Sequence, residues 1–233
     1  MKLHHLFIAL CLSCAFVACN DDDDIQVPTN VVPTQTGEFV DERDQNTYQW
    51  VRIGNLEWSV ENLRYDLPDD TKQLYYIDYN TYYEYTYEDK YSGRFGCLYT
   101  LSGALEAIPE GWRLPTDDDW KALEEALGMS KAESASRDWR GSVEGSMMQQ
   151  VGQGTAFDLL LAGYYSPYIS VLMSPPYRYL GAFGFYWTST SDADKEGEYY
   201  FYRKISCTQA GVYRESMEPE AAMLSVRFVR DAQ

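Results

Sequence analysis

The chain has 233 residues, of which 36 are acidic and 19 are basic, and its net charge is −17. This charge excludes a protein that binds nucleic acid through the backbone phosphates. Its two histidines, His4 and His5, stand in an N-terminal segment that we expect to be removed, which excludes histidine-based catalysis and metal ligation in the mature chain.

The first segment predicts a lipoprotein signal peptide. Residues 6–18 are apolar apart from Ser13, and a helix of that length spans about 20 Å, too short for a hydrocarbon core of about 30 Å. Ala18 precedes Cys19 in an arrangement that resembles a lipobox. We therefore expect residues 1–18 to be removed and Cys19 to carry acyl chains such as palmitate. An ordinary signal peptide with an incidental cysteine is the alternative.

An acidic stretch follows the predicted lipid site. Residues 21–24 are four aspartates, and residues 19–38 lack periodicity, so we expect an acylated cysteine and a flexible tether. The acidic run resembles the surface-export signal of lipoproteins in the Bacteroides group. The resemblance implies an outer-membrane location facing the cell surface, with the periplasmic face as the alternative. Residues 39–233 are then one domain, large enough for a sizeable core.

Two cysteines remain in this domain, Cys97 and Cys207. In an oxidising compartment two cysteines indicate one disulfide. Two buried free thiols are the alternative. Without a CxxC motif or a cluster with zinc spacing, the sequence predicts no metal site.

The domain opens with two runs typical of strands. Residues 48–53 and 56–60 are separated by Gly54 and Asn55, a two-residue connection that predicts a tight hairpin.

A tyrosine-rich segment follows. Residues 75–91 contain eight tyrosines together with four acidic residues. Tyrosine can pack one face of its ring while its hydroxyl stays in water. The segment is therefore either an excursion that packs on the domain or a binding surface. The second interpretation is open because the C–H faces of sugars stack on aromatic rings and carboxylates accept hydrogen bonds from sugar hydroxyls. The candidate ligand-binding residues are Tyr79, Tyr82, Tyr83, Tyr85 and Tyr87.

The next part predicts two helices. Residues 98–108 have helical apolar spacing. A second helix begins at Thr116, which forms a capping-box pattern with Asp119, and it ends at Gly128. Residues 129–156 are polar and mixed, without a clear element.

The remainder predicts strands at 157–161, 186–190, 198–205 and 223–229. Strands, then two helices, then strands indicate an α+β domain. The tryptophans are expected to anchor its core: Trp58, Trp112, Trp120 and Trp187.

Several motifs, which occur in the same order along the chain, resemble those of a known family. The string GWRLPTDDDW at 111–120 resembles a segment shared by the Fibrobacter major paralogous domain and formylglycine-generating-enzyme-like domains. The first of these families is also similar at the hairpin, at 98–105, at 162–164, at 186–190 and at 225–231. The resemblance implies a C-type-lectin-like fold with antiparallel strands, two helices, long loops, and adjacent N- and C-terminal strands.

Departures from the family patterns limit what the resemblance implies. Ile108 and Phe228 stand where the family commonly has two cysteines, so we expect an apolar contact in place of that bridge. The formylglycine-generating relatives use active-site cysteines, and no close pair occurs here. Residues 187–192 also lack the Asn-Asp pair of calcium-dependent lectins. We expect no enzyme activity, no catalytic residue and no cofactor, with calcium left open.

These patterns favour a non-enzymatic lipoprotein of the cell surface that presents a lectin-like domain to a glycan or a protein partner. An accessory subunit of an envelope complex is the alternative. An oxidoreductase of the formylglycine-generating type is a second alternative, and it requires Cys97 and Cys207 to be reduced and adjacent.

Overall fold

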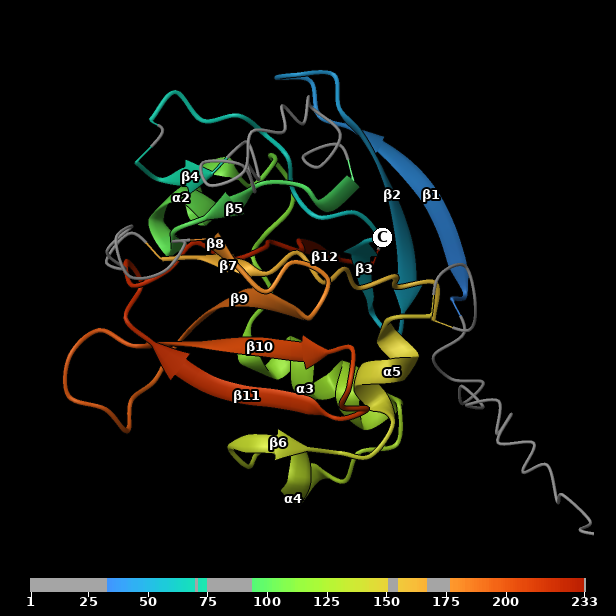
Figure 1. Ribbon diagram of the computed structural model, residues 1–233. Helices are drawn as coiled ribbons and strands as arrows, with labels where there is room; N and C mark the ends of the chain where they lie inside the picture. Colours follow the sequence, from blue (N-terminus) through green and yellow to red (C-terminus); the bar gives the residue numbers. More distant parts are fainter. Residues whose placement is uncertain (1–32, 70, 75–93, 151–154, 167–176, 233) are drawn as a thin grey trace, which may run out of the picture.

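Two four-stranded antiparallel sheets organise the chain (Figure 1). The computed structural model describes residues 33–69, 71–74, 94–150, 155–166 and 177–232. The first sheet has the order β1 (Gln35–Val40), β2 (Thr47–Ile53), β3 (Leu56–Ser59) and β12 (Val229–Asp231). The second has the order β6 (Asp138–Arg140), β11 (Val212–Met217), β10 (Tyr200–Ser206) and β9 (Phe183–Ser191).

Short elements complete the described fold. Two small sheets pair β4 (Gln73–Leu74) with β5 (Leu98–Tyr99) and β7 (Tyr164–Tyr165) with β8 (Tyr177–Arg178). The helices are α2 (Leu101–Ala107), α3 (Asp117–Ala126), α4 (Lys131–Ser134) and α5 (Glu144–Met148). The mixture confirms the α+β class.

The first sheet confirms the predicted hairpin. Strands β2 and β3 pair from Ile53 opposite Leu56, and Gly54 takes the left-handed φ of 61° that such a turn requires. Strand β12 pairs with β3, so the C-terminal strand joins the sheet of the N-terminal strands as expected, with β1 at the opposite edge. Strand β1 already begins at Gln35, however. Residues 35–38, which the sequence placed in the tether, belong to the sheet.

The second sheet is only partly as predicted. Strands β9 and β10 match the runs at 186–190 and 198–205, whereas 157–161 is not a strand. Positive φ angles at Ala156 and Asp158 interrupt extended backbone there. The strand predicted at 223–229 was also wrong for most of its length, since among these residues only Val229 belongs to one of the strands, β12 of the first sheet. Strands β6 and β11 were not predicted.

The helical region follows the capping signals. Thr116 and Asp119 form the reciprocal capping box at the start of α3, as predicted. Helix α2 is shorter than expected because Leu98–Tyr99 pairs as β5 and Thr100 caps the helix from outside. Helices α4 and α5 lie in the polar region that was expected to be irregular.

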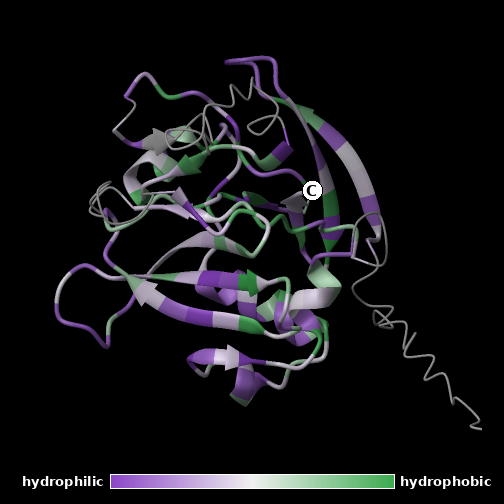
Figure 2. Cartoon of the chain, viewed as in Figure 1, coloured by the Kyte–Doolittle hydropathy of each residue, from purple (hydrophilic) through white to green (hydrophobic). Residues whose placement is uncertain are grey.

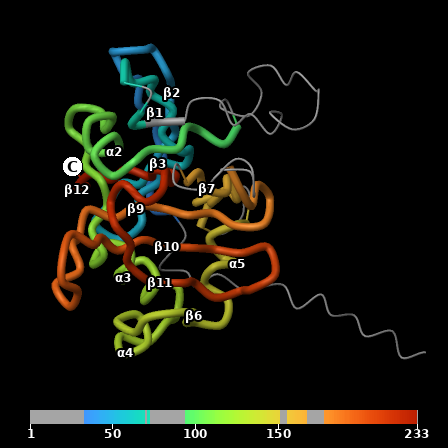
Figure 3. Tube along the Cα trace, turned by 60° about the vertical axis from the view of Figure 1, so that its left-hand side comes forward, coloured from blue at the N-terminus to red at the C-terminus, as the bar shows by residue number. Residues whose placement is uncertain are grey.

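The four tryptophans are buried, as expected: Trp58, Trp112, Trp120 and Trp187. Trp58 and Trp120 meet edge to face at 5.2 Å between ring centroids, joining the first sheet to α3. Ile108 and Phe228 pack in one apolar cluster, in agreement with the expected apolar replacement of the bridge. Figure 3 shows β9, β10 and β11 side by side, with β1 and β2 toward the top of the view.

Candidate functional site

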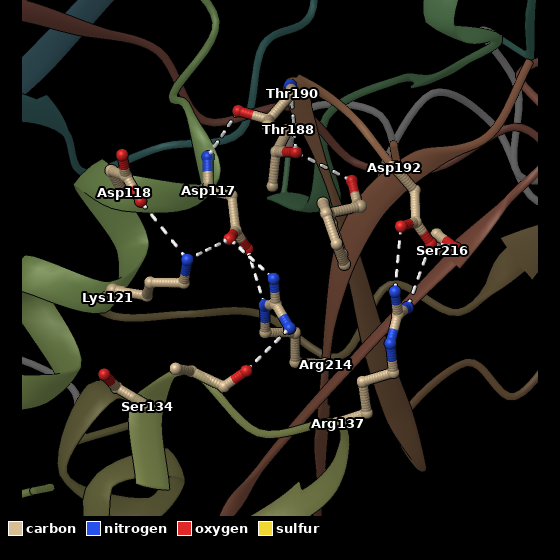
Figure 4. Close-up of polar contacts among 12 residues, drawn as sticks. Asp117, Asp118, Lys121, Ser134, Arg137, Thr188, Thr190, Asp192, Arg214 and Ser216 are labelled. Atoms are coloured by element: carbon tan, nitrogen blue, oxygen red, sulfur yellow. Dashed lines mark hydrogen bonds and ion pairs between the residues drawn. The ribbon is translucent and has the colours of Figure 1, made fainter. Parts of the chain in front are cut away.

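A buried ionic network joins α3 to the second sheet (Figure 4). Asp117 accepts two hydrogen bonds from Arg214, both at 2.8 Å, and one from Arg203 at 2.8 Å. Lys121, one turn along α3, lies 2.6 Å from the same carboxylate. Glu124, seven residues after Asp117 and thus on the same helix face, pairs with Arg140 at 2.9 Å and with Arg203 at 2.7 Å.

The electrostatics of this network are those of a structural anchor. Burial opposes ionisation of Asp117, but Arg214, Arg203 and Lys121 outweigh it and hold the pKa of the carboxyl well below its usual value. The carboxylate is therefore charged throughout the physiological range. A permanently ionised and fully paired carboxylate fixes the orientation of the strands rather than transferring protons.

A second ion pair closes the other end of the sheet. Arg137 donates to both oxygens of Asp192, at 2.8 and 2.9 Å, and Ser216 donates its hydroxyl to the same carboxylate. Figure 4 shows Arg137, which directly precedes β6, and Ser216 of β11 converging on Asp192. Hydrogen bonds from Arg137 hold the pKa of Asp192 well below its usual value. The pair ties the start of the β9–β10 loop to the sheet.

The opposite face of the second sheet carries aromatic side chains. Successive side chains of a strand point to opposite faces, so Arg203 faces α3 while its neighbours Tyr202 and Lys204 face away. In Figure 2 the middles of β10 and β11 are purple, where charged residues stand on both faces. The rings that share this face form a continuous series, in which Phe185 and Tyr202 are buried and the others are partly or largely exposed. We call it the aromatic row: Trp139, Tyr213, Tyr202, Phe185, Tyr164 and Tyr179.

Each ring of the aromatic row contacts the next. The centroid distances from β6 to β9 are 5.4 Å for Trp139–Tyr213, 6.1 Å for Tyr213–Tyr202 and 6.2 Å for Tyr202–Phe185. The row continues over the β7–β8 pair, with 5.1 Å for Phe185–Tyr164 and 5.9 Å for Tyr164–Tyr179. Spacings of 4.5–7 Å are those of favourable aromatic pairs. The row therefore crosses the whole second sheet.

A hollow of about 390 Å³ opens at one end of the row. We call it the aromatic groove. Four rings of the row line it together with one methionine and three small residues: Tyr164, Tyr179, Phe185, Tyr202, Met217, Ser166, Ala221 and Ala222. Its walls thus combine ring faces with tyrosine and serine hydroxyls, the composition typical of ligand pockets.

Tyr179 stands at the groove with unusual geometry. Its side chain is 46% exposed, and its φ of 66° places it in the left-handed region. This conformation costs a non-glycine residue about 1–2 kcal/mol. Its ring nevertheless packs edge to face on Phe183 at 5.3 Å. The fold therefore holds an exposed ring in place at a backbone cost, which is typical of functional positions.

Most of the residues singled out in the sequence fall outside the part of the chain that the structure describes. Cys19 and the five candidate tyrosines, Tyr79, Tyr82, Tyr83, Tyr85 and Tyr87, lie outside the described residues. Cys97 and Cys207 are free, so the expected disulfide is absent from the structure. Cys97 is buried in the core, where burial raises the pKa of its thiol to about 12, whereas Cys207 is exposed. One thiol is therefore in the core and the other at the surface. The alternative of two buried thiols is not what the structure shows either.

Sequence reasoning missed the aromatic row, although a signal for it exists. Phe183 and Phe185 alternate on β9, and Tyr200 and Tyr202 alternate on β10. The period of two places each pair on one face, but only the pairing of the strands aligns the rings into a row.

Among the described residues, no group of three or more His, Cys, Asp or Glu side chains is arranged to hold a metal. The same part of the chain contains no helix long and apolar enough to cross a membrane.

Comparisons with known proteins identify a family but no individual protein that matches the chain. No curated protein matches the chain. No solved structure matches it either. The model of the Fibrobacter succinogenes major domain matches residues 51–230, a range that begins within β2, ends within β12 and includes α3 and the aromatic row. The chain therefore belongs to the Fibrobacter succinogenes major domain family.

Proposed function

We propose that the chain is a non-enzymatic lipoprotein that presents a lectin-like domain at the cell surface, and that the aromatic groove binds carbohydrate. The observation that carries the proposal is the aromatic row, with Tyr179 exposed at its groove end. Aromatic faces accept the apolar C–H faces of sugars, and hydroxyls beside them bind the sugar hydroxyls. The groove offers both.

The packing beneath the row supports a rigid site. Ion pairs of Asp117 and Asp192 fix the inner face of the sheet, so the rings on the outer face are held before a ligand arrives. A preorganised site loses less conformational entropy on binding. A row of rings that crosses the whole sheet suits an extended oligosaccharide better than a compact apolar ligand.

The anchor belongs to the same proposal. Acyl chains on Cys19 would hold the domain at the outer membrane, and the acidic residues after it would extend the domain from the surface. Replacing Cys19 with serine should release the protein from the membrane fraction, and protease added to intact cells should digest the wild type. Retention of the Cys19→Ser variant in washed membranes would contradict lipid anchoring.

A glycan array tests the binding function directly. Wild-type protein should bind a defined set of oligosaccharides, and Tyr179→Ala should lose at least tenfold in affinity. Leu105→Ala is the matched control, because Leu105 is 55% exposed and does not line the groove. A blank array for the wild type, together with one stoichiometric protein partner after crosslinking in cells, would favour the accessory-subunit alternative instead.

A further inference from the structure

Lys204 stands within the aromatic row as a cation without an ionic partner among the described residues. Its ammonium lies 3.6 Å from the Tyr213 ring centroid, 5.0 Å from that of Trp139 and 5.7 Å from that of Phe183. Asp138 acts on it only at longer range, and the carboxylate of Asp138 accepts the backbone N–H of Trp139. Cation–π contact is thus its main stabilisation.

Other cations of the second sheet are bound differently. Arg140, Arg203 and Arg214 each lie within 2.9 Å of a carboxylate oxygen. Arg137, which directly precedes β6, lies 2.8 Å from a carboxylate oxygen of Asp192. Lys204 is half-buried, and burial lowers the pKa of its ammonium group, which means that its surroundings do not fully replace the water it lost. An anion placed over the row would supply the missing counter-charge.

The position of Lys204 connects this charge to the groove. On β10 it pairs with Phe185 of β9 on one side and with Tyr213 of β11 on the other. Phe185 lines the groove, and Phe183, which also faces Lys204, contacts the ring of Tyr179. One ligand can therefore stack on the groove rings and reach the ammonium when it is longer than a single sugar.

From this arrangement we propose that the aromatic row binds an acidic oligosaccharide, whose sugar faces stack on the rings and whose carboxylate pairs with Lys204. The inference rests on the proposed carbohydrate-binding function and names the ligand class of the same site. A charge-assisted contact with a carboxylate is stronger than a contact between neutral groups. It would make the acid the preferred ligand over its neutral counterpart.

An acidic peptide fits this face less well. The row crosses the face of the sheet, where the backbone groups of β9, β10 and β11 are paired with one another. Peptides that bind sheets add to an edge, where free backbone groups receive their main-chain hydrogen bonds. The chain has a net charge of −17, which repels anions at long range, so recognition must come from contact at Lys204 rather than from steering.

A paired glycan array tests the proposal on the full chain. Glycans with uronic or sialic acids are printed beside their methyl esters, so that each pair differs only in the carboxylate charge. Wild type should bind at least one acid tenfold or more tighter than its ester. Lys204→Gln should bind both members equally, at the affinity of the wild type for the ester, and Lys204→Arg should keep the preference for the acid.

The outcomes separate the two levels of the proposal. Equal binding of acid and ester by the wild type, or a preference that survives in Lys204→Gln, would overturn the role of Lys204 and leave carbohydrate binding standing. A wild type that binds neither member of any pair nor any neutral glycan would overturn the proposed function itself. Tighter binding of oligoglutamate than of every acidic glycan would replace the carbohydrate by a peptide. Unfolding curves of the Lys204 variants establish that they are folded.

Discussion

Arg203 and Asp117 meet beneath the second sheet, where the guanidinium Nη1 lies 2.8 Å from the carboxylate Oδ1 although 86 residues separate them in the chain. This contact determines which face of β10 points toward α3. Because side chains alternate along a strand, it also places Tyr202 and Lys204 on the aromatic face. The ionic network therefore positions the rings of the proposed site without touching a ligand.

Replacing Asp117 with asparagine should destabilise the domain strongly. The change leaves Arg203 and Arg214 buried with too little negative charge, and breaking a buried ion pair costs about 3–5 kcal/mol. Asp118→Asn is the matched control, because the neighbouring side chain is 90% exposed and, within the described part of the chain, forms its ion pair with Lys121 alone. Urea unfolding of both variants measures the difference. Equal unfolding free energies for the two variants would contradict the anchoring role.

Acid should weaken the fold through the same carboxylates. The pKa values of Asp117 and Asp192 are lowered in the folded chain, so the unfolded chain takes up protons first as the pH falls. Their contribution is complete above about pH 4, the pKa of an unfolded aspartate, and is lost progressively below it. The unfolding free energy should drop as the pH falls from about 4 to about 2, and less steeply in Asp117→Asn. An identical slope in wild type and variant would contradict this linkage.

Local signals in the sequence predicted the local elements. The Gly54-Asn55 turn, the Thr116–Asp119 capping box and the buried tryptophans are all present. Strand β11 escaped prediction because Arg214 occupies an inward position, where an apolar residue would be expected. A buried arginine becomes acceptable only when Asp117 is opposite it, and that partner is 97 residues away. Such long-range compensation leaves no periodic signal.

Substitutions at Tyr179 should reveal the free-energy cost of its left-handed backbone conformation. Its φ of 66° is permitted for glycine but strained for alanine. Since both substitutions remove the ring, we expect Tyr179→Gly to be more stable than Tyr179→Ala by about 1 kcal/mol. Denaturant midpoints of the two variants provide the measurement. A more stable alanine variant would show that the left-handed conformation is not retained.

Thiol labelling should distinguish the two cysteines of the domain. Cys207 is exposed and should react with a maleimide in the native protein. Cys97 is buried and the pKa of its thiol is raised to about 12, so it should react only after unfolding. Peptide mapping by mass spectrometry reports both sites. A peptide pair linked through Cys97 and Cys207 would restore the disulfide that the sequence suggested.

The candidate site shows where sequence reasoning reaches its limit. The tyrosine-rich segment at 75–91 was a predicted candidate binding surface because its eight tyrosines lie close together in the sequence. The rings of the aromatic row are dispersed from Trp139 to Tyr213, and only strand pairing brings them together. Composition predicted that aromatic residues carry the binding function, while the register of the second sheet determines which of the described rings share a face.

Aromatic carbon–proton NMR of the ligand-bound protein tests the central claim most directly. An oligosaccharide selected by the array is titrated into the full chain, and the ring signals are followed. The signals of Tyr164, Tyr179 and Tyr202 should shift together, with one binding constant, because these rings line one groove. Shifts confined to tyrosines outside the aromatic row, such as those at 75–91, would show that the ligand binds elsewhere and would contradict the account.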